Sequence, residues 1–352
     1  MKKLRVGIIG QGRSGRSIHA KCLVERVADR YEVAAVCDPI VERCEESHRE
    51  TGCRVYTDYR KLLEETDLDI VVNASVSHLH VPVSLDIIAA GHNLLSEKPL
   101  ARTAAEVDRL TEAATKAGVL FAVFQQSRFA PTFLKLREVI DSGVLGRAVM
   151  IKVAFNGFAR RWDWQTLQSH TGGNLYNTGP HPVDQALQLF GDADPEVWCR
   201  MDGVNSFGDA EDHVKLLLSG PNHPTIDIEI SSCAAYAPYV YQVYGSQGGL
   251  TGDHAHLEWK YFKPEEAPPQ ALVREPLTGR KYCSEELIWY TDSWTSTEEE
   301  LSFDYRVEAF YAALYRTMAD GEPLAVTVPE VRRQIAVMEE CHRQNPRPRR
   351  YE

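Results

Sequence analysis

Residues 4–15 read Leu-Arg-Val-Gly-Ile-Ile-Gly-Gln-Gly-Arg-Ser-Gly, a short apolar run that leads into a Gly-x-Gly-x-x-Gly motif. In such a motif the first glycine makes a tight turn, the second lets the backbone approach a pyrophosphate, and the third lets a helix pack closely on the strand. The N-terminus of the following helix attracts negative charge. The stretch therefore predicts a dinucleotide-binding turn, whose cofactor residues are Gly10, Gln11, Gly12, Arg13, Ser14 and Gly15.

Outward from this turn, short apolar runs alternate with amphipathic segments. Strands are expected at Leu4–Ile9, Glu32–Cys37, Arg54–Thr57, Asp69–Ala74, Asn93–Leu95 and Val119–Phe124. Helices are expected between them, at Ser14–Val27, after Cys37 to about Glu50, from near Asp58, and at Val81–Ala90 and Thr103–Lys116. This alternation predicts a parallel sheet covered on both faces. We assign residues 1–126 to an α/β domain of the Rossmann type, which would bind NAD(P).

The pattern changes after about Gln126. A helix is expected at Pro131–Ile140, longer strands at Ala148–Phe155, Val197–Met201, Val214–Leu218, Thr225–Ser231 and Val240–Tyr244, and closing helices at about Tyr305–Met318 and Pro329–Arg343. The strand pattern predicts an α+β domain over residues 127–352 with a large open, mostly antiparallel sheet, serving substrate binding and oligomerisation. Residues 263–300 are rich in proline and charge and are expected to form an insertion loop.

Composition limits the possible partners. A net charge of −11 argues against nucleic-acid binding, which needs a basic face. No apolar run has the length of a membrane span, so we expect no membrane partner. The eight cysteines form no Cys-x-x-Cys pair, which predicts reduced thiols, a cytoplasmic location and no metal site. The grouping of Cys37, Cys44 and Cys53 leaves a metal or redox site as a minor alternative.

Asp38 ends the second expected strand. A carboxylate at this place accepts hydrogen bonds from the ribose hydroxyls of the adenosine and repels a 2′-phosphate, so we expect NAD rather than NADP. Arg13 and Arg43 are close in sequence and would weaken that preference. Capping of the helix after Pro39 is the structural alternative for Asp38, and the two roles are compatible.

Two later motifs point to one family. Glu97-Lys98-Pro99-Leu100-Ala101 follows the fifth strand, and residues 172–184 read Gly-Gly-Asn-Leu-Tyr-Asn-Thr-Gly-Pro-His-Pro-Val-Asp. Together with the glycine turn, His80, Gly91-His92 and Arg128-Phe129-x-Pro131, they resemble the glucose–fructose oxidoreductase/inositol dehydrogenase (Gfo/Idh/MocA) family over residues 1 to about 250. The resemblance implies an NAD(P)-dependent dehydrogenase or reductase. It would transfer hydride between the nicotinamide and a secondary hydroxyl or ketone of a sugar, sugar derivative or inositol.

The resemblance implies that Lys98 and His181 carry the proton chemistry. Lys98 stands at the carboxyl edge of the sheet, where its ammonium can bind the substrate oxygen and stabilise alkoxide charge. An imidazole such as His181 is a natural general base for alcohol oxidation. Asn177 stands where the family most often has Asp, and helical spacing would place it on the same face as His181. Our hypothesis is that His181 alone performs acid–base work and that Asn177 positions substrate.

Further residues are assigned more loosely. Ser75, His80, Glu97, Lys98 and Gln126 are expected at the cofactor, with structural roles as the alternative for several of them. Trp162, Trp164 and Tyr176 offer aromatic faces for a polyhydroxylated ring, and packing at the domain interface is the alternative. Arg128 is expected at the substrate from the resemblance.

Two other functions remain open. Some relatives use bound NAD transiently, cleaving a glycoside through a 3-keto intermediate, and others are cofactor-sensing regulators without catalysis. A homodimer or homotetramer is expected, because the open sheet needs a partner to cover its outer face.

Overall fold

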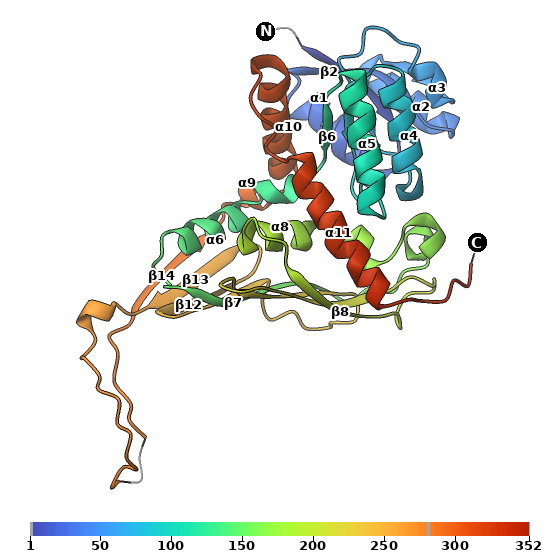
Figure 1. The fold of residues 1–352 in the computed structure, drawn as a ribbon. Helices are drawn as coiled ribbons and strands as arrows, with labels where there is room; N and C mark the ends of the chain where they lie inside the picture. The colour runs from blue at the N-terminus through green and yellow to red at the C-terminus, as the bar shows by residue number, and fades with distance from the viewer. Residues whose placement is uncertain (1–2, 280–281, 352) are drawn as a thin grey trace.

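The computed structural model describes residues 3–279 and 282–351, which form two sheets with helices packed against them (Figure 1). The N-terminal sheet has the order β3-β2-β1-β4-β5-β6, and all of its pairs are parallel. Its strands are β1 (Leu4–Ile9), β2 (Tyr31–Cys37), β3 (Arg54–Tyr56), β4 (Ile70–Asn73), β5 (Leu94–Ser96) and β6 (Phe121–Val123). The strand order reverses between β1 and β4, and ligands bind parallel sheets at such a reversal. The expected Rossmann sheet is confirmed.

The helices of this half also follow the sequence pattern closely. They are η1 (Gly15–Ala20), α1 (Lys21–Glu25), α2 (Val41–Thr51), α3 (Tyr59–Leu62), η2 (Ser77–Leu79), α4 (His80–Ala89) and α5 (Ala104–Ala117). Helix α5 begins with a capping box formed by Thr103 and Glu106, and it ends at Gly118, whose φ is 67°. The first helix differs from the prediction, because it begins as the wide π-helical segment η1 and ends at Glu25.

The second sheet has the order β14-β13-β12-β11-β7-β10-β9-β8, in which only β7 and β10 pair in parallel. Its strands are β7 (Ala148–Asn156), β8 (Glu196–Asp202), β9 (His213–Ser219), β10 (Thr225–Ser231), β11 (Tyr241–Gly245), β12 (Gly248–Gly252), β13 (His256–Tyr261) and β14 (Tyr290–Thr295). The mostly antiparallel sheet is confirmed. The sequence analysis missed β12 and β13. Three of the five residues of β12 are glycine, a residue with low strand propensity.

The prediction of an insertion loop over residues 263–300 is wrong at its C-terminal end. After the short turn η6 (Pro264–Glu266), the chain runs out into a long arm and returns as β14, the edge strand paired with β13 (Figure 1). Helix α9 (Glu298–Leu301) follows. Strand β14 carries threonine, serine and aspartate on a largely exposed edge, so it lacks the apolar alternation that marks a strand in sequence.

Helices cover one face of the second sheet and leave the other free (Figure 1). The covering helices are α6 (Pro131–Asp141), α8 (Pro180–Phe190) and α11 (Val328–Gln344). Strand β10 alternates in burial, with Ile226, Ile228 and Ile230 buried and the residues between them partly exposed. Short helices η3 (Gln126–Phe129), η4 (Trp164–Thr166), η5 (Gln168–His170) and α7 (Asn174–Asn177) occupy the connections that face the first sheet.

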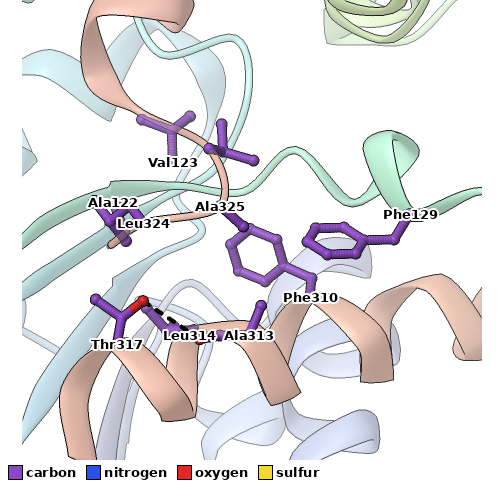
Figure 2. Close-up of a pocket in the computed structure, with 10 residues that line it drawn as sticks. Ala122, Val123, Phe129, Phe310, Ala313, Leu314, Thr317, Leu324 and Ala325 are labelled. Carbon is purple, nitrogen blue, oxygen red and sulfur yellow. Dashed lines mark hydrogen bonds between the residues drawn. The ribbon is translucent and has the colours of Figure 1, made fainter. Parts of the chain in front are cut away.

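Helix α10 (Phe303–Asp320) joins the two halves. The Tyr311 hydroxyl lies 2.7 Å from His19 Nδ1, and the Tyr31 hydroxyl donates to the Tyr311 carbonyl at 2.9 Å. Figure 2 shows Phe310 against Phe129, edge to face with ring centroids 6.0 Å apart. Because α10 follows the second sheet in sequence and packs on the first, the boundary at residue 126 stays a prediction.

Within the described ranges, no helix is both long enough and apolar enough to cross a membrane.

Candidate active site

A cavity of about 700 Å³ lies at the carboxyl edge of the parallel sheet, closed over by the loop around Arg161–Gln165 of the second half. This volume is within the usual range for small-molecule sites. The cavity wall includes many of the residues expected from sequence: Gly10, Gly12, Arg13, Ser14, Asp38, Ser75, His80, Glu97, Lys98, Trp164 and Asn177.

Each of the three glycines of the turn has a different structural role. Gly10 has a φ of 92°, and a Cβ there would collide with the carbonyl of Ala74. A Cβ on Gly15 would collide with the carbonyl of Gly10, so the helix could not pack so closely. A Cβ on Gly12 would meet no atom within 4 Å, because this residue faces open space in the cavity. The turn therefore keeps a backbone cradle free at Gly12, which fits a pyrophosphate.

Asp38 combines the two roles considered from sequence. Its Oδ2 accepts the backbone N–H of Gln11 at 2.7 Å, and its Oδ1 accepts the backbone N–H of Ile40 at 2.9 Å. Arg43 Nη1 lies 3.3 Å from Oδ2, and the carboxylate borders the cavity. The expected contact between the Gln11 side chain and the cofactor is corrected. This side chain is buried and accepts a hydrogen bond from Ser47, so Gln11 contributes to the turn through its backbone.

Lys98 follows β5 and points across to the second half. Its Nζ donates to the backbone carbonyl of Asn177 at 2.8 Å. Burial lowers the pKa of this ammonium, although the nearby Glu97 carboxylate raises it. Burial alone would raise the pKa of Glu97, but the hydrogen bond from His19 and the charge of Lys98 bring it down to about 2. Glu97 is therefore a charged carboxylate held next to Lys98.

His181 lies in the first turn of α8, after the Thr178–Gly179 link from α7. Asn177 and His181 are therefore not on one continuous helix, which corrects the spacing argument. The Nδ1 atom of His181 is buried and has no hydrogen-bond partner among the described residues. Burial, followed by the charge of Lys98, lowers the pKa of His181 well below its ordinary value. The imidazole is consequently neutral at neutral pH and suited to accept a proton.

Two residues expected to contact the cofactor, Ser75 and His80, form hydrogen bonds with other groups of the protein. The Ser75 hydroxyl donates to Asn73 Oδ1 at 2.7 Å, and the His80 ring lies between the carbonyl oxygens of Pro99 and Ser75, at 2.7 and 3.0 Å. Both residues border the cavity and fix the loops that form it. Gln126 is buried, and its Oε1 has no hydrogen-bond partner in the part of the chain that the structure describes. Its role at the cofactor stays a prediction.

Four expected substrate contacts, Arg128, Tyr176, Trp162 and His181, are not part of the cavity wall. Arg128 is 8% exposed and forms a two-pronged ion pair with Asp184, with a further bond to Glu330, so the expected substrate contact is wrong. Tyr176 is also wrong, since its ring is buried and stacks on His342 with centroids 4.5 Å apart. Trp162 is 77% exposed and contacts Phe207 rather than the cavity.

The cavity wall also includes residues that the sequence analysis did not assign. Asp163 caps η4 by accepting the N–H of Gln165, and it holds the Arg161 guanidinium through two hydrogen bonds. The sequence signal was present, because these residues flank the aromatic pair at Trp162 and Trp164. The sequence did not show that these residues lie over a cavity at the edge of the N-terminal sheet.

No group of three or more His, Cys, Asp or Glu side chains that could hold a metal ion occurs within residues 3–279 and 282–351. Burial raises the pKa of Cys37 to about 12, and it also raises the pKa values of Cys44 and Cys53.

Comparison with known proteins identifies the family to which both halves of the chain are similar. Residues 4–125 match the model of the oxidoreductase family with an NAD-binding Rossmann fold, and residues 133–251 match the GFO/IDH/MocA C-terminal domain. The chain belongs to the Gfo/Idh/MocA family. It is thus an oxidoreductase with an NAD-binding Rossmann fold, as the motifs predicted.

Curated relatives of this Gfo/Idh/MocA protein include two inositol dehydrogenases. The chain is 26% identical to scyllo-inositol 2-dehydrogenase (NADP(+)) IolW of Bacillus subtilis, over 96% of this chain and 92% of that one. It is 30% identical to inositol 2-dehydrogenase 2 of Saccharopolyspora erythraea, over 82% of this chain and 84% of that one. In fold it resembles the WlbA dehydrogenase of Bordetella pertussis, solved with NADH and UDP-GlcNAcA, with a TM-score of 0.77, 20% identity and coverage of 97% and 95%.

Proposed function

We propose that this protein is a dehydrogenase that prefers NAD and acts on a secondary hydroxyl of a sugar, sugar derivative or inositol. The observation that carries the proposal is the Lys98 ammonium in the wall of the cavity at the carboxyl edge of the Rossmann sheet, with its charge acting on a buried His181 whose pKa lies well below its ordinary value. An ammonium can hold the alcohol oxygen and stabilise alkoxide charge, and an uncharged imidazole can take the hydroxyl proton.

The residues present fit a nicotinamide dinucleotide. The open cradle at Gly12 and the start of η1 fit the pyrophosphate, and the Asp38 carboxylate at the cavity wall fits the adenosine ribose. When bound, the nicotinamide supplies the acceptor for hydride in oxidation and the donor in reduction. Gln126 is buried and is not part of the cavity wall, so its expected contact with the cofactor rests on the family resemblance.

The proton chemistry falls to two side chains. Lys98 uses one of its three N–H donors on the Asn177 carbonyl, and the others remain for the substrate oxygen. In oxidation the neutral imidazole of His181 accepts the hydroxyl proton, and the Lys98 ammonium stabilises the developing alkoxide. In reduction the imidazolium returns that proton. The Asn177 side chain borders the cavity and positions substrate by hydrogen bonding.

A substrate panel tests this function. We would incubate the protein with NAD and with inositols, aldoses, uronates and glycosides, following NADH absorbance and analysing products in parallel. The proposal expects NADH from at least one polyol or sugar. Product without net NADH would favour glycoside cleavage through a 3-keto intermediate, and cofactor binding without product would favour a cofactor sensor.

The preference for NAD rests on Asp38, whose charge opposes a 2′-phosphate. Arg43 works against it, because its Nη1 lies 3.3 Å from Asp38 Oδ2 and its side chain is 45% exposed and free to turn toward a phosphate. The relative IolW is named for NADP(+). The ratio of kcat/KM for NAD and NADP, measured for the wild type and for Arg43→Ala, tests the preference; a wild-type ratio favouring NADP contradicts it.

We also propose that a second copy of the chain covers the free face of the second sheet. Trp198 and Tyr244 are 53% and 45% exposed, on strand positions that alternate with buried residues. Light scattering across a dilution series tests this, and a monomer at micromolar concentration contradicts it.

A further inference from the structure

His19 is a fully buried imidazole in the π-helical turn η1, directly after the glycine turn. The backbone N–H of Lys21 donates to the carbonyl of Arg16, five residues earlier, where an α-helix would reach back four. Such widened turns are rare and occur frequently at functional sites. The proton chemistry proposed for Lys98 and His181 makes no use of this imidazole, and a polar ring is kept in the interior only where partners satisfy it.

Two side chains from distant parts of the chain satisfy both ring nitrogens of His19. Its Nε2 lies 3.2 Å from Oε1 of Glu97, which follows β5, and its Nδ1 lies 2.7 Å from the hydroxyl of Tyr311 on α10. A charged carboxylate only accepts hydrogen bonds, so Nε2 carries a proton, and a neutral ring then accepts the Tyr311 O–H at Nδ1. The result is a directed chain of hydrogen bonds from Tyr311 through His19 to Glu97.

This chain of hydrogen bonds lies away from water and is held by packing. His19, Glu97 and Tyr311 are all buried. Phe124 packs on the His19 ring with centroids 4.5 Å apart, and Tyr31 packs on the Tyr311 ring with centroids 5.3 Å apart. Hydrogen bonds to an ionised group are strong, more so where water is excluded. Helix α10, which lies alongside the N-terminal half in Figure 1, thus supplies a hydroxyl to the interior of that half.

The second oxygen of Glu97 connects the chain of hydrogen bonds to the cavity. Glu97 Oε2 accepts the backbone N–H of Lys98 at 2.9 Å, and both residues line the cavity at the carboxyl edge of the sheet. The carboxylate is therefore held at both oxygens, by His19 on one side and by the peptide of Lys98 on the other. Burial lowers the pKa of Lys98, and the negative charge of Glu97 raises it. Glu97 thus supports both the backbone from which the ammonium projects and the charge that it carries.

We infer that His19 and Tyr311 are positioning residues, which hold the Glu97 carboxylate against Lys98 so that the lysine stays an ammonium directed at the substrate oxygen. Neither His19 nor Tyr311 lines the cavity, so both act through Glu97. Against the effect of burial, the hydrogen bond from His19 lowers the pKa of Glu97 to about 2. The inference rests on the proposed function, because it concerns the role of Lys98 in that reaction.

The basic limb of the pH profile of kcat/KM tests the inference. An ammonium is lost as the pH rises through its pKa, so a weaker negative charge beside Lys98 should move this limb to lower pH. Glu97→Gln should move it by about one pH unit, and Tyr311→Phe should move it in the same direction by less. Tyr311→Phe keeps the ring contacts and should lower kcat by up to about tenfold, the scale of one hydrogen bond, with little change in KM.

Tyr31→Phe is the matched control. It also removes one buried tyrosine hydroxyl, which donates to the backbone carbonyl of Tyr311 at 2.9 Å rather than to His19. It should lower the free energy of unfolding without moving the basic limb. Tyr311→Phe combined with Glu97→Gln should give the basic limb of Glu97→Gln alone, because the effect of Tyr311 passes through Glu97. A Tyr311→Phe variant that loses stability but keeps the wild-type profile would overturn the inference.

A measurement without turnover separates the inference from the proposed function. Competitive labelling with acetic anhydride across pH, read at Lys98 by mass spectrometry, gives the pKa of that lysine in the free protein. The wild type and Tyr31→Phe should give the same value, and Tyr311→Phe and Glu97→Gln should give lower ones. That order in a protein that oxidises no sugar or polyol refutes the dehydrogenase and supports the hold on Lys98. Turnover with one Lys98 pKa in all four proteins overturns the inference alone, and absence of both turnover and any difference at Lys98 overturns both.

Discussion

Two groups of charged side chains pack against helix α8, and they differ in how completely they are hydrogen-bonded. In the first, Arg128 reaches Asp184 at 2.7 and 2.9 Å and Glu330 at 2.9 Å, and it also donates to the carbonyl of Ala325. In the second, Lys98 makes one bond to a backbone carbonyl, and His181 Nδ1 is buried without a partner within the described chain. Both groups come from segments that the family motifs single out.

This difference in hydrogen bonding indicates which group stabilises the fold and which takes part in the reaction. Buried polar atoms are nearly always paired, so an unpaired one marks either strain or a place for a ligand. A side chain whose pKa is strongly shifted and that lies at a cavity is likewise a candidate for a functional site. The satisfied group around Arg128 therefore contributes to the fold, and the unsatisfied group around His181 contributes to the reaction. Substitutions in each group should affect different measurements.

The largest effect is expected from Lys98→Met. Removing the ammonium should lower kcat for alcohol oxidation by about a thousandfold, the scale of losing a donor to a developing oxyanion. NADH binding, followed by fluorescence, should persist, and the free energy of unfolding should not fall. Lys135→Met is the control, because Lys135 lies outside the cavity wall and pairs with Glu138. Loss of stability with unchanged kcat would reverse the assignment of the two groups.

Arg128→Leu should act on stability instead. It leaves the Asp184 carboxylate buried without its partner, and such a loss costs about 3 kcal/mol or more. Urea denaturation measures the change in the free energy of unfolding, and Arg128→Leu combined with Asp184→Leu should recover part of it. Steady-state KM for the substrate should change little. A large rise in KM without loss of stability would restore the substrate role first expected for Arg128.

The sequence predicts a structural feature well when the contacts that determine it join residues close together in the chain. The Rossmann strands were placed within a few residues because each strand-helix unit carries its own pattern and its own glycine or cap, as at Gly15 and Thr103. The partners of Arg128 lie 56 and 202 residues away, so one sequence does not show that its charge is already neutralised. Lys98 and His181 were found because the motifs around them are specific.

The pH dependence of oxidation should be displaced to the acid side. A free imidazole loses half of its base form near pH 6.5. Burial and the charge of Lys98 lower the pKa of His181 below that, so the neutral form persists and kcat/KM should stay flat from pH 7.5 down through 6.5, falling only at lower pH. A profile of kcat/KM against pH with a substrate that does not titrate in this range checks it. An acid limb centred at 6.5 or above would mean that His181 is not the base or is not shielded.

The smallest effect is expected from Asn177→Asp. The backbone carbonyl of residue 177, rather than its side chain, accepts the hydrogen bond from Lys98, so that bond survives the substitution. A carboxylate at the cavity wall would favour the charged forms of Lys98 and His181 and move the acid limb of the profile upward. Because His181 would remain largely neutral at pH 7.5, we expect kcat there to change by less than about threefold. Asn177→Ala is the comparison, since it removes the side-chain hydrogen bonds without adding charge and should raise KM. If Asn177→Asp kept substrate binding and raised turnover at neutral pH, the side chain at this position would share the proton with His181, and the division between an imidazole base and an amide that only positions substrate would be wrong.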